Sequence, residues 1–217
     1  MSRPQKGTKC ARGNLRTCAL CAFLRLTFLL VLLLPACGQR THIRPLAPDA
    51  VILAFGDSLT AGSGAGEGES YPAVLGQMIG RTGINAGVPG ETSDEGLARL
   101  PSVLEENHPA LVILCEGGND LLQKQDDAII VTHLSAMIDA IKASGADVIV
   151  IGVPRPALLL STASFYKSIA RDYGIPCECD TLSDILSDPG LKSDQIHPNA
   201  KGYLKLAVAL AQLIGSK

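Results

Sequence analysis

Short hydrophobic runs alternate with longer segments that carry apolar residues at helical spacing, from residue 51 to the end of the chain. The runs have strand length and few polar residues, as in strands that are buried on both faces of a sheet. They cover residues 51–55, 84–86, 111–115, 148–153 and 175–177. Helical patterns cover residues 71–79, 94–106, 126–143, 163–173 and 200–214. This alternation predicts an α/β fold whose parallel sheet is covered by helices on both faces.

The first 36 residues differ in composition from the rest of the chain. They contain six basic residues and no acidic residue, and an apolar run covers residues 26–34. A basic segment followed by such a run is typical of a secretory signal peptide, and the run is shorter than the roughly 20 residues of a membrane-spanning helix. The sequence Leu-Pro-Ala-Cys ending at Cys37 resembles a bacterial lipobox. We therefore predict a lipoprotein signal peptide over residues 1–36 and lipidation of Cys37, with cleavage without lipidation or a retained anchor as the alternatives.

The remaining chain is expected to form one domain. Residues 37–49 contain prolines and no hydrophobic period, which predicts a tether. Residues 50–217 hold all the predicted strands and helices, and their number suits one α/β domain but not two ordinary ones. The formal net charge of the whole chain is −2, and loss of the basic leader makes it more negative. Because no cluster of lysine and arginine remains, we expect no nucleic-acid partner. We expect a monomer, although no sequence feature determines the oligomeric state.

The cysteines do not indicate a metal site. Three of the seven precede Cys37, and the other three follow it at spacings that match no zinc-binding pattern. Cys115 lies in an apolar run and is predicted to be a small buried hydrophobic residue. Cys177 and Cys179 are separated by one residue, which we interpret as too close for an unstrained disulfide, with a redox pair as the alternative.

Candidate chemistry lies at both ends of the predicted domain. The sequence Gly-Asp-Ser-Leu places Ser58 directly after the first predicted strand, at the edge of the sheet where ligands of open α/β sheets bind. A serine hydroxyl needs a base within hydrogen-bonding reach, and of the four histidines His197 lies in the most ordered motif, Asp-Gln-Ile-His-Pro. Asp194 can accept a hydrogen bond from the imidazole and fix its tautomer. We predict Ser58 as nucleophile, His197 as base and Asp194 as orienting carboxylate, with a helix cap as the alternative role of Asp194.

Four motifs together resemble the signature blocks of the SGNH (GDSL) hydrolase family. They are Gly-Asp-Ser-Leu around Ser58, the glycine Gly90, Gly-Gly-Asn-Asp around Asn119, and Asp-x-x-His ending at His197. The sequence Gly-Glu-Thr-Ser and the compact length are most similar to the bacterial periplasmic esterases that include the thioesterase/lysophospholipase and its arylesterase relatives. The resemblance implies a flavodoxin-like, three-layer α/β/α sandwich with about five parallel strands.

The resemblance also implies how charge is stabilised. It assigns the oxyanion hole to the backbone N–H groups of Ser58 and Gly90 and to the side-chain amide of Asn119. It requires no metal and no organic cofactor. Beside these residues, Asp57 is predicted to accept hydrogen bonds from loop backbone and Asp120 to form a turn, and neither is assigned a catalytic role.

We therefore expect a serine esterase that forms an acyl-serine intermediate. Its substrates are expected to be small acyl esters or thioesters, with lysophospholipids as a further candidate. We expect it on the periplasmic side of the bacterial cell envelope, anchored to a membrane through Cys37; a soluble periplasmic or secreted protein is the alternative. A carbohydrate or peptidoglycan O-acetyl esterase and a non-catalytic acyl-binding envelope lipoprotein are the alternative functions.

The acyl group is expected to bind in a shallow groove. The chain has no tryptophan, few aromatic residues and no lid-length insertion beside Ser58. Loops over residues 62–68, 121–127 and 155–164 are predicted to form the groove, and the apolar run 157–160 to line one wall. Short to medium acyl chains and activated aryl esters should fit such a groove best.

Overall fold

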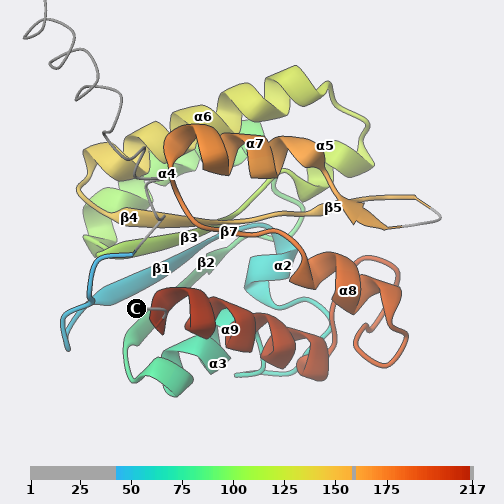
Figure 1. Cartoon of the computed structure of the whole chain (residues 1–217), viewed down its shortest axis with the longest axis horizontal. Helices are drawn as coiled ribbons and strands as arrows, with labels where there is room; N and C mark the ends of the chain where they lie inside the picture. The colour runs from blue at the N-terminus through green and yellow to red at the C-terminus, as the bar shows by residue number, and fades with distance from the viewer. Residues whose placement is uncertain (1–42, 158–159, 216–217) are drawn as a thin grey trace, which may run out of the picture. The chain divides into compact units, whose positions relative to one another are not determined.

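The computed structural model describes residues 43–157 and 160–215 (Figure 1). The predicted signal peptide and the predicted lipidation of Cys37 lie outside these residues and stay predictions. From Ile43 onward, the end of the predicted tether contacts the domain. Arg44 Nε lies 3.0 Å from Asp147 Oδ1, and Arg44 Nη2 donates to the carbonyl oxygen of Gly145 at 2.7 Å.

The described part of the chain contains no helix that combines the length and the apolar character needed to cross a membrane.

Five parallel strands form the central sheet, in the order β2-β1-β3-β4-β7. The strands are β1 (Val51–Gly56), β2 (Thr82–Gly87), β3 (Leu111–Cys115), β4 (Asp147–Ile151) and β7 (Cys177–Glu178). Strand β1 pairs with β2 and β3 on its two sides, so that Ile52 lies opposite both Gly83 and Leu111. This is the strand order of flavodoxin-like folds, and the predicted parallel sheet is confirmed.

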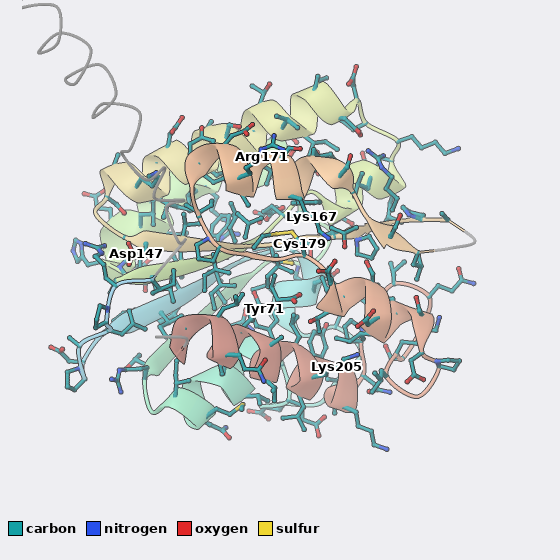
Figure 2. The ribbon with its side chains drawn as sticks, viewed as in Figure 1. Tyr71, Asp147, Lys167, Arg171, Cys179 and Lys205 are labelled. Carbon is teal, nitrogen blue, oxygen red and sulfur yellow. A yellow bond between two sulfur atoms is a disulfide. The ribbon has the colours of Figure 1, made fainter. Side chains whose placement is uncertain are left out.

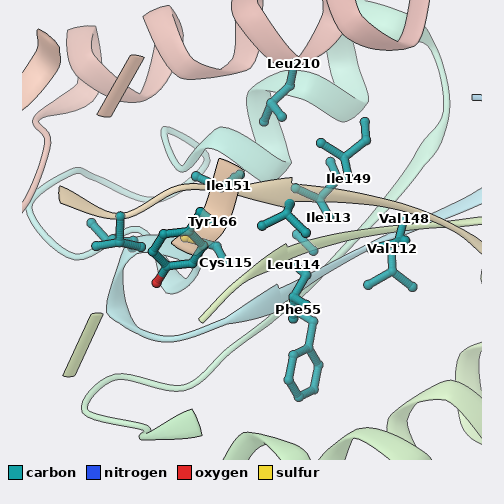
Figure 3. Packing of buried hydrophobic residues seen from close by; sticks show 14 of the residues in the cluster. Phe55, Val112, Ile113, Leu114, Cys115, Val148, Ile149, Ile151, Tyr166 and Leu210 are labelled. Atoms are coloured by element: carbon teal, nitrogen blue, oxygen red, sulfur yellow. The ribbon is translucent and has the colours of Figure 1, made fainter. Parts of the chain in front are cut away.

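Helices cover both faces of the sheet (Figure 1). One layer contains α3 (Tyr71–Ile79) and α9 (Ala200–Gly215), and the other contains α4 (Ser93–Asn107), α6 (Asp127–Ala143) and α7 (Ser164–Tyr173). Successive strand residues point to opposite faces. Figure 3 accordingly shows Ile113 and Ile149 on the side of Leu210 from α9, whereas Phe55 points to the other side. The three-layer α/β/α sandwich is therefore confirmed.

Several short elements were not predicted from the sequence. They are α2 (Ser58–Ala61), α5 (Gly118–Leu122), α8 (Thr181–Ser187) and the antiparallel pair β5 (Pro154–Arg155) and β6 (Ser161–Thr162). Each is too short to show a hydrophobic period. Most of them border the carboxyl ends of the strands, so they shape the rim where a ligand would bind.

The cysteine pair at the end of the sheet differs from the sequence-based expectation. A disulfide joins Cys177 and Cys179 across Glu178, and Figure 2 shows it near the labelled Cys179. Residues two apart in a strand point to the same side, and here the two Cα atoms are 5.3 Å apart, which a disulfide can span. The two cysteines, which were expected to be too close for an unstrained disulfide, are thus joined in the structure, and the alternative of a redox pair stays a prediction. Cys115 is buried as predicted.

Candidate active site

The structure brings Ser58, His197 and Asp194 together, although 139 positions separate the serine from the histidine. Ser58 Oγ lies 3.0 Å from His197 Nε2, and His197 Nδ1 lies 2.8 Å from Asp194 Oδ2. Ser58 is the first residue of α2, directly beyond the end of β1. Asp57 caps this short helix, because its Oδ1 accepts a hydrogen bond from the Leu59 backbone N–H at 2.9 Å. The predicted backbone role of Asp57 therefore agrees with its position.

Asp194 holds both the imidazole and the loop that carries it. Its Oδ1 accepts hydrogen bonds from the backbone N–H groups of Ile196 and His197, each at 2.8 Å. Burial raises the pKa of Asp194, but the hydrogen bonds from the His197 side chain and from these backbone groups outweigh it and leave the pKa below its usual value. An ionised Asp194 favours the tautomer with the proton on Nδ1, which leaves Nε2 to accept the Ser58 proton.

The alternative role of Asp194 as a helix cap is not what the structure shows. Helix α9 begins at Ala200, and Asn199 Oδ1 accepts hydrogen bonds from the backbone N–H groups of Lys201 at 3.0 Å and Gly202 at 3.1 Å. Asn199 therefore caps the helix, and the Asp194 carboxylate faces the histidine instead.

Asn119 lies at the start of the short helix α5 that follows β3, and Gly90 lies in the loop that follows β2. Asn119 Nδ2 donates to the backbone carbonyl of Glu91 at 2.7 Å and lies 3.5 Å from Asp57 Oδ2. An amide nitrogen carries two hydrogens, and the short bond to Glu91 fixes the orientation of the group. The second hydrogen makes only the long contact with Asp57, which a closer ligand oxygen can replace. Gly90 has φ +86°, a conformation that residues with a side chain rarely adopt. Asn119 lines the cavity beside Ser58, whereas Gly90 is not among its described lining residues and joins the site through its neighbour Glu91.

An ion pair behind Gly90 was missed by the sequence analysis. The buried Glu91 carboxylate accepts two hydrogen bonds from Arg99, at 2.7 Å from Nε and 2.6 Å from Nη2. Arg99 Nη2 also donates to the carbonyl of Ala86 at 3.1 Å, and its guanidinium lies 4.1 Å from the centre of the Phe55 ring. Arg99 thus fixes the whole loop after β2. Glu91 and Arg99 are eight residues apart, and the sequence alone does not indicate that they are in contact. The contact exists because helix α4 brings Arg99 over the loop that carries Glu91.

Asp120 has a larger role than the predicted turn. Its Oδ2 accepts from the Ser93 backbone N–H at 2.8 Å, and its Oδ1 accepts from Ser93 Oγ at 2.6 Å. Ser93 Oγ also lies 2.9 Å from His133 Nδ1. These bonds join the start of α4 to α5, so the loops that carry Gly90 and Asn119 are held against each other.

Two further buried carboxyl groups lie near the site, and burial changes their ionisation. Burial raises the pKa of Asp57 to about 7, although the hydrogen bond from Leu59 opposes this shift. Burial, the charge of Asp57 and a hydrogen bond with Glu91 raise the pKa of Glu116 well above its usual value. As a carboxylate, Glu116 Oε1 would have no donor among the described residues, whereas a protonated Glu116 can donate to Glu91. The direction of this pKa shift favours the protonated form of Glu116 beside Glu91.

A cavity of about 730 Å³ opens beside Ser58, within the range of small-molecule sites. Its apolar lining residues are Leu59, Leu122, Val153, Pro154, Pro156, Ala157, Leu160, Leu186 and Ile196. Its polar lining residues include Ser58, Asn119, Ser187, Lys192, Gln195 and His197. The predicted contributions of loops 121–127 and 155–164 agree with this lining, including both described ends of the run 157–160.

The predicted contribution of loop 62–68 was wrong, because none of its residues lines the cavity. This glycine-rich loop instead packs behind the segment that carries His197. Gly64 lies so close to Ser193 that a Cβ atom there would overlap Ser193 Oγ, and Tyr203 Oη donates to the Ser63 carbonyl at 2.8 Å. Residues 186–197, from the end of α8 to His197, line this wall of the cavity in place of loop 62–68. The sequence alone did not predict where this segment lies.

Comparison with known proteins agrees with this geometry. Residues 54–205 match the GDSL-like Lipase/Acylhydrolase family. The chain is 35% identical over 130 residues to esterase TesA of Pseudomonas aeruginosa; the match covers 58% of this chain and 65% of that protein, just under two thirds of its length. It is 29% identical over 164 residues to thioesterase 1/protease 1/lysophospholipase L1 of Escherichia coli strain K12, covering 72% of this chain and 78% of that protein.

A solved structure shows the same fold. It is that of the psychrotrophic esterase EstA from Pseudoalteromonas sp., inhibited by monoethylphosphonate, with a TM-score of 0.66 and 25% sequence identity. The similarity covers 75% of this chain and 96% of EstA. Because the family match spans more than half of the chain, the chain belongs to the GDSL-like lipase/acylhydrolase family, also called SGNH hydrolases. It is thus a serine hydrolase of the class that acts on ester bonds.

Proposed function

We propose that Ser58, His197 and Asp194 are the catalytic residues of an esterase that acts through an acyl-serine intermediate. The observation that carries this proposal is the continuous chain of hydrogen bonds from Ser58 through His197 to Asp194, at the wall of a largely apolar cavity. The hydroxyl, the imidazole and the carboxylate stand in the order that nucleophilic acyl transfer requires.

In the acylation step, Ser58 Oγ attacks the carbonyl carbon of the substrate while its proton passes to His197 Nε2. Asp194 stabilises the resulting imidazolium without taking its proton. The tetrahedral intermediate then collapses, the bond from carbon to the leaving oxygen or sulfur breaks, and His197 gives its proton to the leaving group. The acyl group remains on Ser58 as an ester.

Water completes the reaction in the second step. His197 takes a proton from water, the hydroxide oxygen bonds to the acyl carbon, and the bond to Ser58 Oγ breaks as His197 returns the proton to that oxygen. In both steps the negative oxygen is proposed to lie against the backbone N–H groups of Ser58 and Gly90 and the Asn119 amide. Each such donor typically contributes about 2.7–4 kcal/mol to stabilisation of the transition state.

The cavity supports acyl esters and thioesters as substrates. Its many aliphatic and proline side chains can bury a hydrocarbon chain, and each buried methylene contributes about 0.8 kcal/mol. The names of the relatives, an esterase and a thioesterase/lysophospholipase, support the same substrate classes. The wall formed by Leu122, Pro154, Pro156, Ala157 and Leu160 is the candidate acyl-binding side.

A series of p-nitrophenyl esters from acetate to palmitate tests this assignment, with an acyl-CoA and a lysophospholipid alongside. We expect kcat/KM to rise by up to about fourfold for each added methylene until the chain fills the cavity, and to be highest for short to medium chains. Turnover confined to acetylated glycans, without hydrolysis of aryl esters, would instead establish an O-acetyl esterase.

We also propose that the enzyme is attached to a membrane on the periplasmic side of the cell envelope through lipid on Cys37. The lipobox-like sequence supports this proposal. Several acyl chains give effectively stable anchoring, unlike the marginal binding of a single chain. Native protein should require detergent for extraction, and its N-terminal peptide should begin with a lipid-modified Cys37 in mass spectrometry. A peptide that contains an unmodified Cys37 or the intact leader would contradict this prediction, and Cys37→Ser is the control that should release the protein.

A further inference from the structure

Lys192 stands apart from the other residues that line the cavity. Among the described lining residues it is the one permanently cationic side chain. Its Nζ donates to the backbone carbonyl of Leu186 at 2.7 Å, and none of the ion pairs found among the described residues involves it. An ammonium group has three donors, so two remain for a ligand. By contrast, the nearby Arg155 on β5 is already paired with Asp127.

The two sides of the cavity differ in polarity. Lys192, the hydroxyl of Ser187 and the amide of Gln195 come from α8 and the segment after it, which also supply the apolar Leu186 and Ile196. The segments that carry Pro154, Ala157 and Leu160 supply apolar groups instead. A substrate with one hydrocarbon part and one polar, charged part matches such a division.

The mechanism tells which part of the substrate belongs on the polar side. His197 must donate its proton to the leaving atom, so the leaving group has to lie against the segment that carries His197. Lys192 and Gln195 belong to that same segment, and a backbone bridge between Lys192 and Pro198 holds its two ends together. The acyl chain, which stays on Ser58, can then extend toward β5 and β6.

We propose that Lys192, together with Ser187 and Gln195, forms a subsite for a phosphate group on the leaving alcohol or thiol. This inference rests on the proposed function of Ser58 and His197. It names the preferred substrates as acyl esters or thioesters whose leaving group carries phosphate, such as an acyl glycerophosphate or an acyl-CoA. The remaining ammonium hydrogens of Lys192 donate to the phosphate oxygens, while the hydroxyl and amide groups can complete their coordination.

The charge of the chain makes this subsite selective. Acidic residues outnumber lysine and arginine, 21 to 19, in the whole chain, and the excess is larger beyond the basic leader. An anionic substrate is repelled by such surroundings unless a local cation compensates, and Lys192 is the cation that the described part of the cavity supplies.

Two pairs of substrates with the same acyl chain test the subsite. The first pair is octanoyl-CoA and the neutral thioester S-octanoyl-N-acetylcysteamine; the second is 1-octanoylglycerol 3-phosphate and 1-octanoylglycerol. For Lys192→Gln we expect kcat/KM to fall about tenfold for the phosphate-bearing member of a pair and to stay unchanged for the neutral member. Lys192→Arg should keep most of the preference, and added salt should reduce it in the wild type. A fall for one pair and not for the other identifies which leaving group the subsite accepts.

The exposed Lys201 provides the matched control, because it lies near this segment but does not line the cavity. Lys201→Gln should leave the preference intact, which separates a local contact from the general effect of removing a charge. An equal loss for neutral and charged substrates in Lys192→Gln would overturn the subsite and indicate that Nζ serves to hold Leu186 at the end of α8. A wild type that hydrolyses none of the four compounds would count against the proposed function itself, which is a different outcome.

Discussion

Replacing Ser58 with alanine will abolish ester hydrolysis and leave the domain folded. The substitution removes one oxygen atom, and the capping bond from Leu59 to Asp57 that supports α2 does not involve it. Loss of a nucleophilic serine lowers kcat by about 10⁶ in enzymes of this chemistry. Hydrolysis of a p-nitrophenyl ester by the purified variant measures the loss, and thermal unfolding followed by circular dichroism measures the stability.

Ser144→Ala is the matched control for this change. Ser144 Oγ donates to the Ile141 carbonyl at 2.7 Å at the end of α6, far along the chain from the candidate catalytic residues. This variant should keep wild-type activity. A phosphonate inhibitor should add its mass to the wild type and to Ser144→Ala, but not to Ser58→Ala. Wild-type hydrolysis by Ser58→Ala would exclude the acyl-serine mechanism, and absence of hydrolysis in the wild type on every ester tested would favour the non-catalytic binding protein.

The sequence predicted the layers of the fold because the spacing of apolar residues in long segments indicates which face of each helix or strand is buried. The run 111–115 coincides with β3, which is buried along its whole length, and the pattern at 71–79 coincides with α3. The short elements α2, α5 and α8 escaped prediction because four to seven residues cannot show a helical period. Strand β7 begins at Cys177, where the predicted run ended, because Pro176 interrupts that run.

The candidate site was predictable to the extent that its chemistry lies in local motifs. Ser58, Asp194 and His197 could be named because a hydroxyl, a carboxylate and an imidazole each stood in a recognisable sequence. The residues that hold the site in place could not be predicted, because their roles depend on contacts between separate elements. The bond from Asn119 to the Glu91 carbonyl joins the loop after β3 to the loop after β2, and Arg99 reaches Glu91 from α4. Lys192 likewise could not be singled out from the sequence, because its place in the cavity wall is known only from the structure.

Asn119→Ala should lower activity strongly, although less than loss of Ser58, if the Asn119 amide acts on the transition state as proposed. Glu91 holds one hydrogen of the amide at 2.7 Å, and the Arg99 ion pair fixes Glu91 in turn, so the other hydrogen is oriented before substrate binds. A donor placed in advance gains most when the carbonyl oxygen becomes negative, which happens in the transition state and not in the bound ester. We therefore expect kcat to fall about tenfold to a thousandfold while KM changes little.

Steady-state kinetics with one p-nitrophenyl ester, corrected for the fraction of active sites by phosphonate titration, separate this loss from a loss of folded protein. Asn107→Ala is the control, because Asn107 Nδ2 donates to the Val103 carbonyl at 2.8 Å at the far end of α4 and its removal should leave kcat unchanged. A rise in KM at constant kcat would mean that Asn119 binds the ground state of the substrate. In that case the oxyanion would depend on the backbone N–H groups of Ser58 and Gly90, and the bond to Glu91 would serve only to join the two loops.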